Sequence, residues 1–170
     1  MRVGILTISD RSSRGERADV SGPRLVQRAE EQGWEVVQTG IVSDDMDAIR
    51  AALLAWSDSG EVDLILTTGG TGFAPRDMAP EATRSVLERE TPGLTEAMRA
   101  ASLRITPHAM LSRAAAGIRG VTLIVNLPGS PRAADENLAV IIPVLPHAVD
   151  LLRGDPDAEA GHRLPPFPAT

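Results

Sequence analysis

Two reactive side chains are missing from this sequence altogether. None of its 170 residues is a cysteine, and all 17 basic residues are arginine, so lysine is absent as well. Without cysteine there can be no disulfide, no thiolate zinc site and no cysteine nucleophile. Without lysine there can be no Walker-type phosphate loop, no lysyl-adenylate intermediate and no Schiff base. The absence of lysine excludes more classes of enzyme than any motif in the chain does.

Long apolar runs and an excess of basic charge are also missing. Apolar runs such as residues 123–125 and 140–142 are far shorter than the roughly 20 residues of a membrane span. The first residues have the pattern of a strand rather than of a signal peptide, so we expect a cytoplasmic protein with no membrane partner. The net charge of −6 repels polyanions, and we expect no nucleic acid partner.

The size and composition are those of one globular domain. The chain has a mass of 18.0 kDa, with 42% hydrophobic and 24% charged residues, and a single core of this size buries about two-thirds of the unfolded surface. We assign residues 1–154 to one domain and residues 155–170 to a Pro-rich C-terminal tail. The tail has few apolar residues, and we predict that it is extended and partly disordered.

Predicted strands alternate with predicted helices along the domain. Apolar, β-branched runs predict strands at residues 2–8, 35–42, 62–66 and 121–125. Caps and apolar spacing predict helices from Ser21 to Gly33, over 46–56 after a cap at Asp44 or Asp45, from Pro80 to about 90, and over 94–105. A further helix is predicted from Ser130 and Pro131 onward, and the prolines at 143 and 146 separate helical residues 137–142 from 148–152. The alternation predicts an α/β domain of three α-β-α layers with a mainly parallel sheet.

Polar residues follow each predicted strand. Ser9 and Asp10 follow the first, Asp44 and Asp45 the second, a glycine-rich run the third, and residues 126–130 the last. Ligands bind at the carboxyl ends of the strands in such sheets, where the strand order reverses. We therefore expect these four segments to share one edge.

The glycine-rich run predicts an anion site. Residues 69, 70 and 72 are glycine, which lets backbone N–H groups approach a ligand where a Cβ would intrude, and Thr68 and Thr71 add hydroxyl donors. The alternative interpretation is a tight turn between strand and helix that binds nothing.

Asp77 points to a metal ion beside that run. A carboxylate next to phosphates is repelled unless a cation lies between them, and Mg²⁺ is commonly held by one or two carboxylates with phosphate oxygens and water. Asp44 is the obvious second carboxylate, although a helix cap explains it equally well. Glu81, taken alone, is better explained by a favourable interaction with its helix dipole than by a role as a ligand.

Two further segments have open interpretations. Residues 126–131 offer the Asn126 amide, a bend at Pro128 and a helix N-terminus, which together could hold a polar ring or an anion; a plain turn is the alternative. Residues Arg11, Arg14 and Arg17 could recognise phosphates from a flexible loop, but we prefer the interpretation that this loop is simply solvated.

The motifs together resemble those of the molybdopterin adenylyltransferase family. That family includes the bacterial MogA and MoaB proteins and the G domains of plant and animal homologues. The resemblance is carried, in the same order and spacing, by residues 8–11, 67–77 with 80–83, 111–113 and 126–131, across about residues 3–153. Departures at Ser43, where many relatives have proline, and at Met78 and Ala79 lie at the rim of the pocket rather than its floor.

The resemblance implies a trimeric or hexameric α/β protein that binds molybdopterin and Mg-ATP. It would join AMP to the terminal phosphate of the pterin and release pyrophosphate, and the molybdenum-inserting enzyme of the same pathway is an expected partner. The resemblance implies that Asp44 and Asp77 are the essential catalytic carboxylates, with Mg²⁺ held between them. The positions that match the family's pocket are Ser9, Asp10, Thr68, Gly69, Gly70, Thr71, Gly72, Glu81, Ser112, Asn126, Pro128, Gly129 and Ser130.

Two other functions stay open on the sequence alone. The protein could bind molybdopterin without catalysis, as a carrier or scaffold of the MoaB type, because members of one fold family can differ in activity. A generic nucleotide-binding regulator with a flavodoxin-like sheet is a weaker alternative, since it leaves the co-occurrence of the motifs unexplained.

Overall fold

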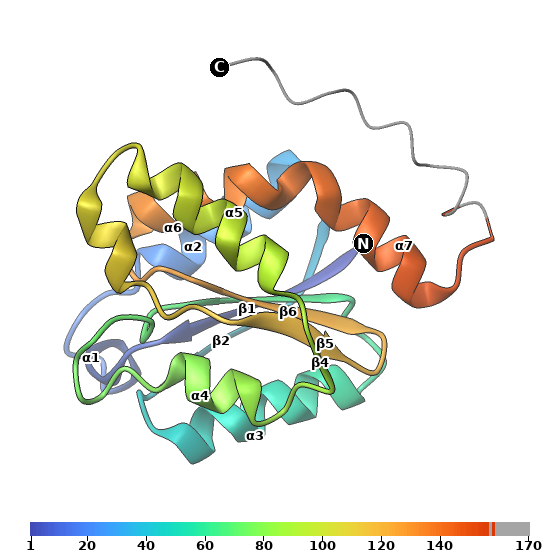
Figure 1. Cartoon of the computed structure of the whole chain (residues 1–170). Coiled ribbons are helices and arrows are strands. Elements are labelled where there is room, and N and C mark those ends of the chain that lie inside the picture. Colours follow the sequence, from blue (N-terminus) through green and yellow to red (C-terminus); the bar gives the residue numbers. More distant parts are fainter. Residues whose placement is uncertain (157, 159–170) are drawn as a thin grey trace.

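The chain forms three layers, with helices on both faces of a central sheet (Figure 1). The structure is a computed structural model that describes residues 1–156 and 158, so the prediction for the tail falls almost entirely outside the described residues. The strands are β1 (Arg2–Ile8), β2 (Glu35–Val42), β3 (Leu64–Thr68), β4 (Arg89–Glu90), β5 (Ala116–Arg119) and β6 (Thr122–Leu127). The helices are α1 (Asp10–Ser13), α2 (Ser21–Glu31), α3 (Met46–Asp58), α4 (Ala79–Arg84), α5 (Pro92–Leu103), α6 (Pro131–Ile141) and α7 (Leu145–Arg153), with 3₁₀ turns η1 (Pro107–Leu111) and η2 (Ile142–Val144).

Strand order places the predicted ligand-binding edge. In the described residues the order is β2-β1-β3-β6-β5-β4; β2, β1, β3 and β6 are parallel, while β5 is antiparallel to both of its neighbours. The chain leaves β1 toward β2 on one side and returns to β3 on the other, so the order reverses between β1 and β3. The loops after β1 and β3 meet at this point, as the sequence predicted.

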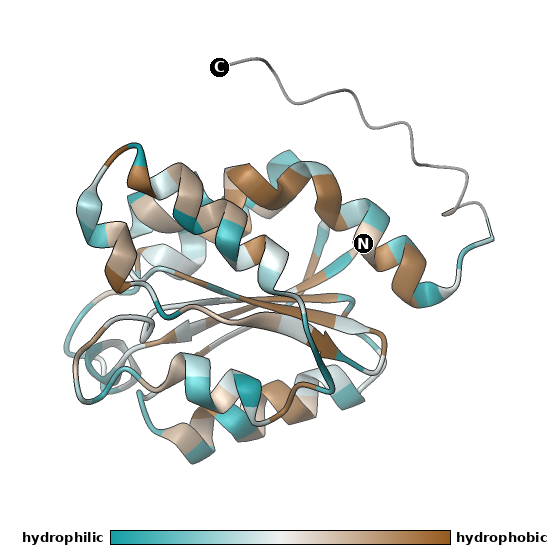
Figure 2. Cartoon of the chain, in the orientation of Figure 1, coloured by the Kyte–Doolittle hydropathy of each residue, from teal (hydrophilic) through white to brown (hydrophobic). Residues whose placement is uncertain are grey.

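Alternating side chains of the strands supply two separate cores. In β1, Val3 and Ile5 pack under α2 and α6, whereas Leu6 and Ile8 pack against α3. Figure 2 shows the hydrophobic residues concentrated along the strands and in the helices that cover them. None of the helices in the described residues is long and apolar enough to cross a membrane. The predicted single α/β fold with a mainly parallel sheet is confirmed.

Several predicted boundaries were wrong. The helix expected from Pro80 to about 90 ends at Arg84, because the chain then enters β4, whose two exposed residues give no periodic signal. Strand β5 was also missed. Strand β3 begins two residues later than expected and includes Thr67 and Thr68, which pair with β1 and β6.

The helix caps also differ in part. Ser21 makes no side-chain cap for α2; instead the Asp19 carboxylate accepts hydrogen bonds from the N–H groups of Ser21 (3.0 Å) and Gly22 (3.1 Å). Asp45 caps α3 by accepting a hydrogen bond from the N–H of Ala48 (2.9 Å). Asp45 is therefore the N-cap of α3, and the other candidate cap, Asp44, is free to act in the predicted ligand site.

A buried aspartate fastens the end of the sheet opposite the predicted site. Asp63 is 3% exposed and accepts hydrogen bonds from the N–H (2.5 Å) and guanidinium (2.9 Å) of Arg2 and from the guanidinium of Arg153 (2.5 Å). Burial raises the pKa of Asp63, but the hydrogen bonds from Arg2 and Arg153 together outweigh burial and lower the pKa to about 2. The cluster joins β1, the approach to β3 and the end of α7.

Replacing this aspartate should weaken the fold in a pH-dependent way. The folded-state pKa lies below the ordinary value of 3.8, so ionised Asp63 contributes stability above that pH and the contribution is lost as the pH falls toward 2. Asp63→Asn should lower the free energy of unfolding by about 2 kcal/mol at neutral pH, with a gap that narrows in acid. Urea unfolding between roughly pH 3 and pH 7 measures this. Asp58→Asn, at an exposed ion pair with Arg119, should cost under about 1 kcal/mol, and a pH-independent gap at Asp63 would contradict the account.

Candidate functional site

The glycine-rich loop after β3 leaves its backbone donors free. The carbonyl of Gly70 accepts from the N–H of Ala79 (3.1 Å), that of Thr71 from the N–H of Arg113 (3.0 Å), and that of Gly72 from the Arg113 guanidinium (2.7 Å). The N–H groups of the same three loop residues bond to nothing in the part of the chain that the structure describes. Three adjacent free donors on glycine-rich backbone are what an anion site requires.

Two turns pack against each other to form this loop. Gly69 has φ +105°, and a Cβ there would lie 2.2 Å from the carbonyl oxygen of Ile8, so only glycine fits. A Cβ on Gly129 would lie 3.2 Å from the Cα of Gly69. The Thr68 hydroxyl donates a hydrogen bond to the Pro128 carbonyl (2.7 Å), which ties the turn after β3 to the turn after β6.

A polar cavity of about 540 Å³ opens beside the loop, at the carboxyl ends of β1 and β3. Asp44 and Asp77 both line this cavity, together with Asp10. The loop passes close to each predicted carboxylate: a Cβ on Gly70 would lie 3.2 Å from Asp44, and one on Gly72 would lie 2.9 Å from Asp77. Gly70 therefore shares a cavity with both aspartates, and Gly72 approaches the Asp77 carboxylate from the next position but one along the loop.

The carboxylates in this cavity differ in how their charges are balanced. The N–H of Asp10 donates to the Asp44 carboxylate (2.7 Å), and the N–H of Asp44 donates to the Asp10 carboxylate (3.1 Å). Two hydrogen bonds from the Arg76 guanidinium (3.0 and 2.8 Å) lower the pKa of Asp10. Burial raises the pKa of Asp44, and the charges of Asp10 and Asp77 raise it further. No ion pair offsets Asp44 within the described residues, so an added cation would stabilise its ionised form.

A second cavity, of about 270 Å³ and mostly apolar, lies on the other side of the loop. Helix α5 supplies one wall through Thr95, Met98, Arg99 and Ser102. The Arg99 guanidinium donates two hydrogen bonds (3.3 and 3.2 Å) to the carbonyl of Ser112, which lines the same cavity. Residues 71, 72 and 128 also line it, so the two cavities adjoin at the glycine-rich loop and the turn after β6.

Asn126 forms a wall of the second cavity with its amide already engaged. The fully buried side chain donates to the hydroxyls of Thr67 (2.9 Å) and Thr83 (2.8 Å) and accepts from the N–H of Ala115 (3.1 Å). Both of its N–H bonds are thus used inside the protein. The amide joins β3, β6 and α4 and fixes the cavity wall from which the turn at Pro128 emerges.

Arg113 braces the glycine-rich loop from Thr71 to Asp77. Its guanidinium donates to the carbonyls of Gly72 and Asp77 and pairs with the Glu81 carboxylate, while its N–H holds Thr71. One side chain therefore fixes the loop from the free amides to the aspartate that the sequence predicts to be catalytic. Ser112, the preceding residue, lies in the second cavity.

Comparison with known proteins identifies the family. A family model described as a probable molybdopterin binding domain matches residues 4–147. The chain belongs to the MogA/MoaB molybdopterin-binding family of molybdenum cofactor biosynthesis.

Relatives of this MogA/MoaB protein have different names. The crystal structure of the molybdopterin biosynthesis enzyme MoaB from Thermus thermophilus is 52% identical with a TM-score of 0.86, covering 91% of this chain and 98% of that one. The molybdopterin adenylyltransferase of Helicobacter pylori J99 is 41% identical over 157 residues, which are 91% of this chain and 89% of that protein. The gephyrin of Dictyostelium discoideum is 45% identical over 91% of this chain, which spans only 23% of its length.

The residues singled out by resemblance to the MogA/MoaB family divide between the two cavities. The polar cavity is lined by Ser9, Asp10, Asp44, Thr68, Gly69, Gly70, Asp77, Gly129 and Ser130. The apolar cavity is lined by Thr71, Gly72, Ser112, Asn126 and Pro128. Glu81 lies outside both, beside Phe73 and paired with Arg113.

Sequence reasoning missed two parts of this MogA/MoaB site. Residues 95, 99 and 102 of α5 follow one another at helical spacing as polar side chains, a signal that could have marked a face turned toward a cavity. Arg113 lay in a matched motif, but no local pattern shows that its side chain would reach the loop of Asp77.

Arg113→Gln should release the glycine-rich loop. Loss of the guanidinium removes the bonds to the two carbonyls and to Glu81, so exchange of the hydrogen-bonded loop amides of Ala74 and Asp77 should accelerate by roughly tenfold or more. Exchange followed by mass spectrometry measures this. Arg119→Gln is a matched control, because Arg119 likewise pairs with a carboxylate and a carbonyl, but far along the chain from the loop. Unchanged protection of the Ala74 and Asp77 amides in Arg113→Gln would contradict the role given to this side chain.

Proposed function

We propose that the protein is a molybdopterin adenylyltransferase, which transfers AMP from Mg-ATP to the terminal phosphate of molybdopterin and releases pyrophosphate. The observation that carries the proposal is a loop of three free amides between two adjoining cavities: Gly70 lines the polar cavity with Asp44 and Asp77, whereas the next two loop residues line the mostly apolar one. The name of the Helicobacter pylori relative supports it.

The two cavities suit the two substrates. The polar cavity offers unpaired donors and carboxylates, as a triphosphate with its cation requires. The smaller cavity offers apolar walls with a few polar groups, which suits a flat heterocycle such as a pterin. We assign the nucleotide to the first cavity and molybdopterin to the second, with its phosphate directed toward the shared loop.

The proposed reaction needs positioning more than proton transfer. A phosphate monoester is already an anion and needs no strong general base to attack the α-phosphate. The chain's task is to align the two groups and to neutralise charge. The amides of Gly70, Thr71 and Gly72 would hold phosphate oxygens between the substrates, and the packed glycine turns exclude side chains from that space.

The acidic side chains fit a magnesium ion that arrives with the nucleotide. Asp44 and Asp77 supply hard oxygen ligands, and the raised pKa of Asp44 reflects burial and then neighbouring negative charge. The described residues contain no group of three or more ligating side chains that could hold a metal alone, so phosphate oxygens would have to complete the coordination. Bound there, Mg²⁺ would neutralise charge on the triphosphate.

A non-catalytic molybdopterin carrier of the MoaB type is the second candidate, because the 44% identical molybdenum cofactor biosynthesis protein B of Escherichia coli has a name that states no transferase activity. Pyrophosphate release distinguishes the two candidates. A transferase releases pyrophosphate from ATP when molybdopterin is added, whereas a carrier releases none.

We also propose a trimer or hexamer, a cytoplasmic location, and the molybdenum-inserting enzyme of the pathway as a partner. Exposed apolar side chains at the end of α5 and around η1, namely Leu103, Ile105, Met110 and Leu111, are consistent with a covered surface. Light scattering at micromolar concentration tests the assembly, and a monomer would contradict it.

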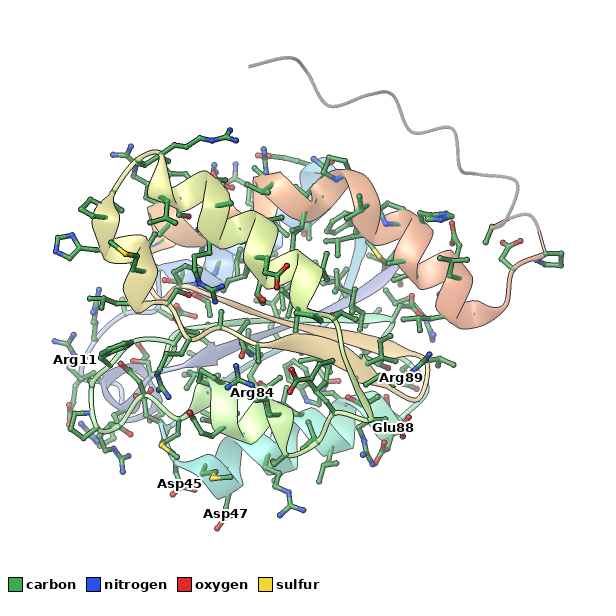
Figure 3. All side chains as sticks on the ribbon, in the orientation of Figure 1. Arg11, Asp45, Asp47, Arg84, Glu88 and Arg89 are labelled. Carbon is green, nitrogen blue, oxygen red and sulfur yellow. The ribbon has the colours of Figure 1, made fainter. Side chains whose placement is uncertain are left out.

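Asp77→Asn should abolish adenylyl transfer while leaving molybdopterin binding largely intact, because Asp77 lines the nucleotide cavity and not the apolar one. Turnover should fall by roughly 100-fold or more, measured as adenylylated pterin by mass spectrometry, with pterin affinity measured separately. Asp47→Asn on α3 is the control, since Figure 3 shows Asp47 projecting from the outer side of that helix. Transfer by Asp77→Asn at the parental rate would show that Asp77 has no catalytic role.

A further inference from the structure

Two arginines on the polar cavity have side chains without a hydrogen-bond or ion-pair partner among the residues that the structure describes. Arg11 and Arg17 both line the cavity, and neither side chain makes a hydrogen bond or ion pair within the described residues. Arg14 lies between them in sequence but does not line the cavity, and its guanidinium bonds both oxygens of Glu16 (2.7 and 3.0 Å). No local pattern in the sequence distinguishes these three arginines; the structure separates them by their contacts.

The charges of the cavity are arranged unevenly. Four carboxylates line it, those of Asp10, Asp19, Asp44 and Asp77, and Asp10 pairs with Arg76, which does not line the cavity. Arg11 and Arg17 are the only cationic side chains among the described residues that line it; both come from the segment that follows β1, Arg11 from α1 itself. Figure 3 shows Arg11 at the outer edge of the molecule, where α1 lies. Because the chain has no lysine, guanidinium groups are its only strong side-chain cations for phosphate.

The positions of the two cavities set the direction of the leaving group. Attacking and leaving oxygens lie roughly in line across the phosphorus in this class of reaction. If the nucleophile comes from the apolar cavity, past Gly72 and Pro128, the leaving group must point to the far side of the polar cavity. The loop after β1, with Arg11 and Arg17, forms a wall of the polar cavity and does not line the apolar one.

We propose that Arg11 and Arg17 form a binding site for the β- and γ-phosphates of the nucleotide, the group that leaves as pyrophosphate. The inference rests on the proposed function. In that reaction a phosphate oxygen of molybdopterin forms a bond to the α-phosphorus, the bond from that phosphorus to the bridging oxygen breaks, and the electron pair stays on pyrophosphate. The two guanidinium groups stabilise this added charge through charge-assisted hydrogen bonds.

Binding of inorganic tripolyphosphate to the 170-residue chain tests the site without catalysis. Calorimetric titration in the presence of Mg²⁺ compares the parent with Arg11→Gln/Arg17→Gln, with AMP as the second ligand. The double variant should bind tripolyphosphate at least roughly tenfold more weakly and AMP within about twofold of the parent. Arg14→Gln, which removes a charge of the same sign from the same loop, should bind both ligands as the parent does.

Three results overturn the assignment: parental affinity for tripolyphosphate in the double variant, an equal loss in Arg14→Gln, or an equal loss of affinity for AMP and tripolyphosphate. Failure of the proposed function looks different. In that case the parent releases no pyrophosphate from ATP and molybdopterin, while tripolyphosphate affinity still falls only in the double variant. The protein would then be non-catalytic but would keep this phosphate site.

Discussion

The hydrogen bonds that occupy the carbonyls of the glycine-rich loop are the constraint on which the site depends. The carbonyls of Gly70, Thr71 and Gly72 accept hydrogen bonds from Arg113 and from the start of α4. The N–H groups of the same three residues have no partner in the described chain. An unpaired backbone donor is costly when buried, so a loop of this kind is stable only where water or an anion can reach it. The same arrangement that builds the loop therefore prepares it for a negatively charged ligand.

Sheet topology brings the rest of the site to this loop. The reversal of strand order between β1 and β3 places the segment after β1 on one side and the turn after β6 on the other. Glycine at 69 and 129 lets the two turns touch, so one narrow strip of backbone separates a polar cavity from an apolar one. Two substrates can then approach a common point from cavities of opposite character.

The sequence predicted the fold and the residues of this edge because both depend on local signals. Apolar runs, glycines and polar residues at strand ends are visible in short windows, and β1, β2 and the two aspartates were found that way. Strand β4 and the role of Arg113 were not, because they depend on contacts between segments distant in the chain. Separating Arg11 and Arg17 from Arg14 also needed coordinates, since the sequence shows neither that Arg14 pairs with Glu16 nor that Arg14 lies off the cavity.

A crystal structure of the protein with Mg²⁺ and a non-hydrolysable ATP analogue tests the central claim most directly. The account predicts phosphate oxygens within hydrogen-bond distance of the amides of Gly70 to Gly72, with one metal ion bound by Asp44 and Asp77. A triphosphate bound elsewhere, with those amides facing water, would contradict it.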